Sequence, residues 1–133
     1  MSNSSQGGGA QAFVTSAAQV APETWNDARG RIAFHTLVSA GATPSNGLVA
    51  GLATVEPGGC LARHRHGPAE IYYVVSGESV VTIEGVAHAV RPGSTVFIPA
   101  NAWHQIDNRF DGPMRFFYVF SGDRFEDVEY VFA

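Results

Sequence analysis

Histidine is the residue type whose spacing most clearly suggests chemistry. His64 and His66 are two residues apart, Glu70 follows four residues later, and His104 lies further along the chain. Residues two apart on a β-strand face the same side, so His64 and His66 would share a face, as would Glu70 and Tyr72 on the next extended run. Three imidazoles and one carboxylate would then converge on one divalent transition metal. Fe(II) is the ion we expect, and Mn(II), Ni(II), Co(II), Cu(II) or Zn(II) also suit this nitrogen and oxygen set.

These four residues stand at fixed distances from glycine and proline. The pattern G-x5-H-x-H-x3-E-x6-G runs from Gly58 to Gly77, and G-x5-P-x-N-x2-H-x3-N runs from Gly93 to Asn108. Both patterns resemble the two motifs of the cupin superfamily, whose second motif usually has glycine where Asn101 stands. Asparagine tolerates a left-handed backbone, so this departure is a mild one. The three glycines are expected to serve turns.

The resemblance implies a jelly-roll β-barrel, usually dimeric, with the three histidines and Glu70 as metal ligands. The remaining two histidines, His35 and His88, lie outside both motifs and are expected to be ordinary core or surface residues.

The elements that must position these side chains are mostly strands. The 133 residues fit one domain, which we place at 13–133 behind a Gly- and Ser-rich flexible tail at 1–12. A short helical segment is expected between Phe13 and Ala28, because Pro22 suits a first helical turn and Trp25 would be its large apolar residue. After Arg29 the pattern is short apolar runs separated by turn residues, which predicts an all-β barrel or sandwich. The runs are 31–38, 47–55, 71–75, 79–83, 86–90, 95–98, 103–106, 114–120 and 128–132.

Composition excludes several other classes of protein. All eight basic residues are arginine. The net charge of −4 argues against binding to a nucleic-acid backbone, which would require a basic patch. The sequence shows neither an apolar run of membrane-spanning length nor a signal-peptide pattern. The single cysteine, Cys60, excludes an internal disulfide framework and CxxC zinc sites. We therefore expect a cytoplasmic protein with no membrane or nucleic-acid partner.

Two further stretches narrow the resemblance. Pro68-Ala69-Glu70-Ile71-Tyr72 sets a tyrosine two residues after the carboxylate, and an acidic and aromatic run extends from Asp123 to Tyr130. From about Trp25 to the end, the chain is similar to the small cupin dimethylsulfoniopropionate lyases. That resemblance implies a β-elimination that releases dimethyl sulfide and acrylate from a small sulfonium carboxylate.

The resemblance also implies roles for single residues. The metal would bind the substrate carboxylate as a Lewis acid. Tyr72 would be the base that removes the neighbouring proton, with Tyr130 as the second choice. The sulfonium, which has no proton to donate, needs an aromatic surface, and Trp25 and Tyr118 are the candidates for substrate binding.

Two alternatives use the same barrel. A cupin dioxygenase would bind a small chelating substrate and oxygen at the same four ligands, whereas a lyase would turn over without oxygen. A non-catalytic barrel would only bind a small ligand. A homodimer is expected in each case, from the cupin habit and from the many apolar strands. A sugar-phosphate isomerase is disfavoured, because the chain has no lysine to hold a phosphate.

Overall fold

The computed structural model describes residues 9–133, and it is all-β apart from two single-turn 3-10 helices. The predicted fold class is confirmed. The elements are η1 (Ala17–Gln19), β1 (Glu23–Asp27), β2 (Gly30–Val38), β3 (Leu48–Val55), β4 (Cys60–Arg65), β5 (Glu70–Ser76), β6 (Ser79–Ile83), β7 (Val86–Val90), β8 (Thr95–Ile98), β9 (His104–Asp107), β10 (Met114–Ser121), η2 (Phe125–Asp127) and β11 (Val131–Phe132).

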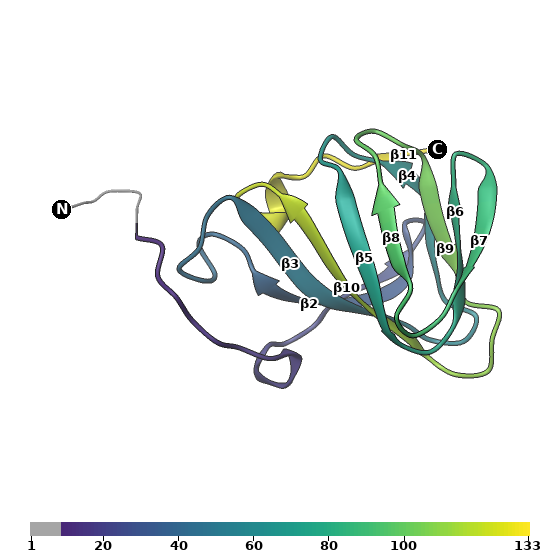
Figure 1. The fold of residues 1–133 in the computed structure, drawn as a ribbon, viewed down its shortest axis with the longest axis horizontal. Coiled ribbons are helices and arrows are strands. Elements are labelled where there is room, and N and C mark those ends of the chain that lie inside the picture. Colours follow the sequence, from purple (N-terminus) through teal and green to yellow (C-terminus); the bar gives the residue numbers. More distant parts are fainter. Residues whose placement is uncertain (1–8) are drawn as a thin grey trace.

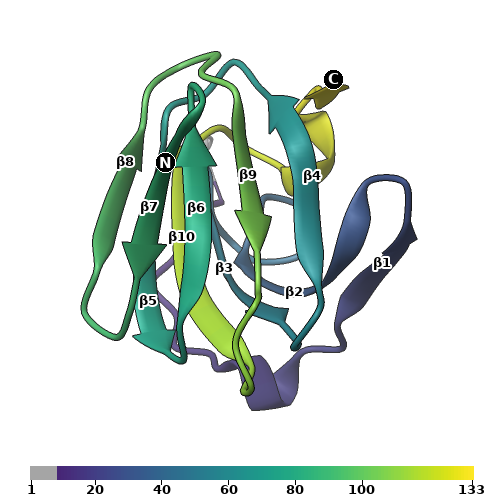
Figure 2. The same cartoon turned by 90° about the vertical axis from the view of Figure 1, so that its right-hand side faces the viewer.

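All strand pairs are antiparallel, and they form one sheet in the order β7-β6-β9-β4-β2-β3-β10-β5-β8. β1 pairs with β2 and β11 pairs with β4 beside this path. The sheet curls on itself, so that β5 and β8 face β4, β6 and β9 across the interior (Figure 1). The C-terminal β11 lies beside β4 at one end of the barrel (Figure 2). That end is where the candidate ligands gather.

The barrel interior follows the period-2 alternation of the strands. In β10 the residues from Met114 to Phe120 are buried and exposed in turn, with the aromatic members Phe116, Tyr118 and Phe120 pointing inward. The inward residues form one apolar core. Burial of this core, rather than local propensity, fixes which face of each strand points inward.

The expected short helical segment between Phe13 and Ala28 is present, but it does not include Pro22 or Trp25 as predicted. Only the single turn η1 is helical there, and Trp25 lies in the middle of strand β1 with its side chain buried. A tight turn explains the difference, because the Asp27 carboxylate accepts hydrogen bonds from the backbone and side chain of Arg29 and so pairs β1 with β2. Trp25 then packs its ring at 4.9 Å from Phe34, a contact that a local helix would not provide.

The other predicted runs match strands to within one or two residues, except at the C-terminus. There the predicted run 128–132 is shortened to β11 and preceded by η2. Gly58, Gly77 and Gly93 have φ of 78°, 76° and 92°, and Asn101 has φ of 61°, so the motif turns are left-handed as expected. The first eight residues of the predicted tail lie outside the described residues, and the domain division stays a prediction. No helix within residues 9–133 is long and apolar enough to cross a membrane.

Candidate metal centre

The strand register brings the four predicted ligands to one end of the barrel interior. His64 in β4 lies directly opposite His104 in β9, and Glu70 begins β5. His66 lies one residue beyond the end of β4, yet its side chain still points inward. All four side chains are buried, with exposed fractions of 1–6%. The backbone N–H of Asn101 donates to the carbonyl of His66 at 2.9 Å, so the left-handed turn of the second motif holds the end of the first.

Each histidine ring is oriented by a backbone carbonyl two residues away. The Nδ1 atoms of His64, His66 and His104 lie 2.7, 3.0 and 2.9 Å from the carbonyl oxygens of Ala62, Pro68 and Ala102. A carbonyl only accepts hydrogen bonds, so each Nδ1 must carry the proton and donate it. In the neutral ring, Nε2 is then the unprotonated nitrogen. Such a contact on the far nitrogen is the usual way in which proteins orient a histidine for a metal.

The free nitrogens of these rings converge. The three histidines offer ligand atoms that all lie within 4.8 Å of one another. Glu70 Oε1 is 3.1 Å from Nε2 of His66 and 3.7 Å from Nε2 of His104. Among the described residues, His104 Nε2 finds no hydrogen-bond partner although it is buried. The unprotonated Nε2 atoms and the carboxylate of Glu70 are all hydrogen-bond acceptors, so burying them together without a donor or a cation is unfavourable. A divalent cation satisfies all of them, so the donor set fits a metal.

Burial and mutual charge shift the pKa values of this group. Burial and the neighbouring imidazole of His104 lower the pKa of His64 to about 3. Burial also acts to lower the pKa of His66, but the hydrogen bond and charge of Glu70 outweigh it and the pKa is raised. Burial acts to raise the pKa of Glu70, but its contacts with His104 and His66 outweigh that and lower it. The site therefore favours an ionised Glu70 and an uncharged His64, which are the protonation states that metal binding requires, whereas the raised pKa of His66 means that metal binding would displace a proton from that ring.

The two predicted catalytic tyrosines both lie beside this cluster. Tyr72 is on the same face of β5 as Glu70, and its ring is 6.3 Å from that of His104. Tyr130 comes just before β11, and its ring is 5.4 Å from both His64 and His66. Burial and the charge of Glu70 raise the pKa of both tyrosines well above 10.

The two predicted substrate-binding aromatics differ in their surroundings. Trp25 packs edge-on against Tyr130 at 5.5 Å, and the Arg29 guanidinium lies over its ring at 4.3 Å. Tyr118 lies opposite Tyr72 on β10, and its hydroxyl is 3.4 Å from that of Thr36. Burial raises the pKa of Tyr118 above its ordinary value. Trp25 is thus next to the cluster through Tyr130, whereas Tyr118 belongs to the wall behind Tyr72.

Sequence reasoning missed part of the aromatic wall around the histidines. Phe120 lies 6.1 Å from the His66 ring, Phe132 lies 5.5 Å from the His64 ring, and Phe125 stacks near Tyr130. The alternation of β10 was a usable signal for Phe120. Phe125 lies in the acidic and aromatic run and Phe132 in the predicted run 128–132, but neither pattern indicated that these side chains would face the histidines.

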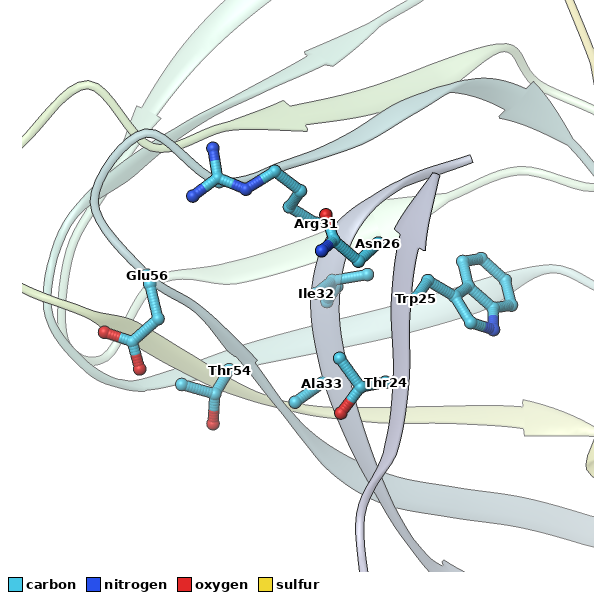
Figure 3. A pocket seen from close by; sticks show the side chains of 9 residues that line it. Thr24, Trp25, Asn26, Arg31, Ile32, Ala33, Thr54 and Glu56 are labelled. Atoms are coloured by element: carbon cyan, nitrogen blue, oxygen red, sulfur yellow. The ribbon is translucent and has the colours of Figure 1, made fainter. Parts of the chain in front are cut away.

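Two cavities flank the cluster. One of about 370 Å³ is lined by Trp25, Phe125 and Tyr130 with polar residues at its rim, and one of about 350 Å³ includes His66 and Val131. A third, of about 230 Å³, lies between β1, β2 and β3, and there the Trp25 indole extends away from Thr54 and Glu56 (Figure 3). The second cavity includes the candidate ligand His66, and the first is lined by Tyr130, whose ring lies 5.4 Å from two of the histidines. These two cavities are the candidate approaches to the metal centre.

Residues 51–120 match the family model of the cupin domain. This chain is a cupin. Dimethylsulfoniopropionate lyase DddW from Ruegeria pomeroyi is 37% identical over 104 residues, which span 78% of this chain and 68% of that protein. The 5-nitrosalicylic acid 1,2-dioxygenase of a Bradyrhizobium species is 31% identical over 64 residues, 48% of this chain and 30% of that enzyme.

Solved structures show the same fold. The crystal structure of the dimethylsulfoniopropionate lyase DddQ from Ruegeria pomeroyi superposes with a TM-score of 0.69 at 23% identity, covering 87% of this cupin and 62% of DddQ. The likeness shows the cupin fold, and within it three buried histidines could hold a metal ion.

Proposed function

We propose that this cupin is a metal-dependent carbon-sulfur lyase that cleaves dimethylsulfoniopropionate into dimethyl sulfide and acrylate. The observation that carries the proposal is the 37% identity to a dimethylsulfoniopropionate lyase over 78% of the chain. The geometry supports it independently, because two tyrosines lie beside a buried set of three imidazoles and one carboxylate.

His64, His66, Glu70 and His104 would hold the metal, for which we propose Fe(II). When bound, such an ion supplies a Lewis acid that binds the substrate carboxylate and makes the neighbouring C–H more acidic. The protein's part is to keep each Nε2 unprotonated through the carbonyl contacts of Nδ1. The buried setting also excludes bulk water from the charges.

Tyr72 is the base in this proposal. Its oxygen takes the proton from the carbon next to the carboxylate, the electrons of that C–H bond form the C=C bond of acrylate, and dimethyl sulfide leaves with the C–S electron pair. Burial and Glu70 raise the pKa of Tyr72. The positive charges of a bound cation and of the sulfonium act in the opposite direction and favour the phenolate. Tyr130, beside two of the ligands, is the second candidate for the base.

The cationic end of the substrate would lie against Trp25. The Arg29 guanidinium rests over that indole at 4.3 Å, and this contact supports a cation-binding role for the Trp25 ring. The cavity lined by Trp25 and Tyr130 lies beside this surface, and the Tyr130 ring is 5.4 Å from both His64 and His66. Tyr118 would contribute to the aromatic wall rather than contact the reacting atoms.

The test is headspace detection of dimethyl sulfide from purified, metal-loaded protein given dimethylsulfoniopropionate, under air and under nitrogen. We expect equal release under both gases, since elimination needs no oxygen. The protein stripped by a chelator is the matched control and should release none. No dimethyl sulfide from protein with one equivalent of bound Fe(II), Mn(II) or Zn(II) would overturn the proposal.

A dioxygenase is the second candidate, and the partial likeness to the Bradyrhizobium dioxygenase is what favours it. The same four ligands would then bind a small chelating substrate together with oxygen. Oxygen uptake with a salicylate or a diketone, in place of dimethyl sulfide release, would establish this function. A cupin that binds one of these compounds without turnover would be the non-catalytic alternative.

A further inference from the structure

One indole and two guanidiniums meet on the outer side of the strand that carries His64. In β4, Arg63 is exposed, His64 is buried and Arg65 is half-buried, so the two arginines point away from the barrel interior. Trp103 comes directly before His104, the residue that pairs with His64 across the two strands. The guanidinium carbons of Arg63 and Arg65 lie 4.8 and 5.0 Å from the centre of the Trp103 ring. We call these three residues the Arg-Trp-Arg cluster.

The two arginines of the cluster lack an acidic partner in the described part of the chain. Arg29 and Arg109 each pair with an aspartate, but within residues 9–133 neither Arg63 nor Arg65 forms an ion pair. The Nε of Arg65 is also buried without a hydrogen-bond partner among those residues. Arginine stays charged in proteins, and neighbouring like charges on a sheet destabilise it. A bound anion would remove the repulsion and accept hydrogen bonds from the unused donors.

The turn between β6 and β7 holds the backbone of Trp103 in place. The Glu84 carboxylate accepts a hydrogen bond from the backbone N–H of Trp103 at 2.9 Å, and the backbone N–H of Glu84 donates to the carbonyl of Trp103 at 2.8 Å. Glu84 itself has a left-handed φ of 48°. This carboxylate therefore fixes the residue that carries the indole and leaves the guanidiniums unpaired. The platform on which the arginines stack is held by the protein before any ligand binds.

We propose that the Arg-Trp-Arg cluster binds a phosphate group on the outside of the barrel. A guanidinium that stacks on an indole keeps the N–H groups at its edge free, and this planar fork matches two oxygens of a phosphate. A carboxylate offers only two oxygens, which one arginine fork already occupies. Inorganic phosphate or a phosphate monoester offers at least three, so it can accept from both guanidiniums. Its charge of about −1.5 to −2 at pH 7 also balances the two positive charges.

The position of the cluster predicts what a bound phosphate would do. Arg65 lies between His64 and His66 in the sequence, and Trp103 directly precedes His104. A phosphate held here would join β4 to the start of β9 from the outside and stabilise the folded chain without entering the barrel interior. The net charge of −4 provides no general attraction for anions, so phosphate binding would depend on this local pair of arginines.

The test is isothermal titration calorimetry of the whole chain with inorganic phosphate, glycerol phosphate and acetate at constant ionic strength. We expect one phosphate per chain, and in Arg63→Gln/Arg65→Gln an affinity lower by at least about tenfold, the loss of one charge-assisted contact. Arg91→Gln/Arg115→Gln is the matched control, because it removes the same charge from exposed positions and should bind like the wild type. Tighter binding of glycerol phosphate than of inorganic phosphate would identify the ligand as a phosphate ester, and the reverse as the free ion. No binding by the wild type, equal binding by the two double variants, or equal binding of acetate overturns the proposal.

A single variant keeps the proposal testable if the double variant fails to fold. Arg63 is exposed, so Arg63→Gln alone should fold and still lower the phosphate affinity, whereas Arg91→Gln should not. Phosphate should also raise the Tm of the wild type and of Arg91→Gln more than that of Arg63→Gln. Binding that is unchanged in Arg63→Gln and disappears when a chelator strips the metal would place the phosphate on the metal, and this result contradicts the proposal.

Discussion

Strand β5 contains two adjacent tyrosines followed by two adjacent valines, and in each pair one side chain points into the barrel and the other points outward. Tyr72 and Val74 are 2% and 1% exposed, whereas Tyr73 and Val75 are 48% and 51% exposed. The inward face begins with Glu70 at the metal centre and continues into the apolar core. The outward face presents apolar side chains to solvent. Chemically identical side chains thus have different tasks, and the alternation of the strand is what separates them.

The largest expected effect comes from Glu70→Gln on the inward face. The substitution keeps the shape of the side chain and removes the charge that three buried imidazoles face. We expect metal affinity to fall by more than the roughly 10–100-fold that loss of a supporting residue causes. Dimethyl sulfide release should be lost with it. Elemental analysis of the purified variant checks the first point, and full metal content would show that Glu70 is not a ligand.

Tyr72→Phe should have the next largest effect, a loss of reaction rate. The variant keeps the ring and its packing against Phe116 at 4.4 Å, but it removes the hydroxyl oxygen of Tyr72, which is the atom proposed to take the proton. Loss of a general base typically costs about 10²–10⁴ in rate, and metal content should stay unchanged. The same substitution one residue along, Tyr73→Phe, is the matched control and should retain the rate.

Tyr130→Phe completes this comparison, because Tyr130 is the second candidate. If it abolishes dimethyl sulfide release while Tyr72→Phe does not, the two roles are exchanged. If both variants stay active, neither tyrosine is the base.

The valine pair gives a smaller contrast, in stability rather than in rate. Val74→Ala removes two buried methyl groups and should cost about 2 kcal/mol of unfolding free energy. Val75→Ala should stay within about 0.5 kcal/mol, because its side chain is half exposed. Urea unfolding measures both, at concentrations where the two variants have the same mass. Equal costs would mean that the outward face is as well packed as the core.

A pH dependence is expected for the stability of the metal-free protein. The pKa of His64 falls from 6.5 to about 3 on folding. Between these values the unfolded chain binds the extra proton, so stability decreases as the pH falls below 6.5, by about 1.4 kcal/mol per pH unit. The lowered pKa of Glu70 adds to this loss below its ordinary value, 4.5.

The raised pKa of His66 affects stability on the alkaline side, where stability falls as the pH rises. The contribution of His66 to folding stability is complete below pH 6.5. It is lost as the pH rises through the higher pKa that His66 has in the folded state. Stability of the metal-free protein should therefore be greatest near neutral pH. In chelator-treated samples, His64→Gln should reduce the loss of unfolding free energy between pH 6.5 and 4.5, as measured by urea unfolding at each pH. An unchanged loss over this range would contradict the assignment to His64.

The sequence by itself determined the parts of the site that depend on spacing along a strand or through a turn. The separation of His64 and His66 and that of Glu70 and Tyr72 predicted shared faces, and the glycines and Asn101 predicted the left-handed turns. These features are local, because the period of a strand and the conformational freedom of a residue do not depend on distant neighbours.

Only the tertiary structure decided what lies against those residues. Trp25 was predicted in a helix, and its place in β1 follows from pairing with β2 and from burial against Phe34. Tyr130 approaches two histidines from the segment between η2 and β11. That segment has no regular periodicity, so the sequence does not predict which way its side chains point. The carbonyls that fix each Nδ1 proton were equally hidden, because backbone direction at a ring is set by the closed barrel rather than by residue type.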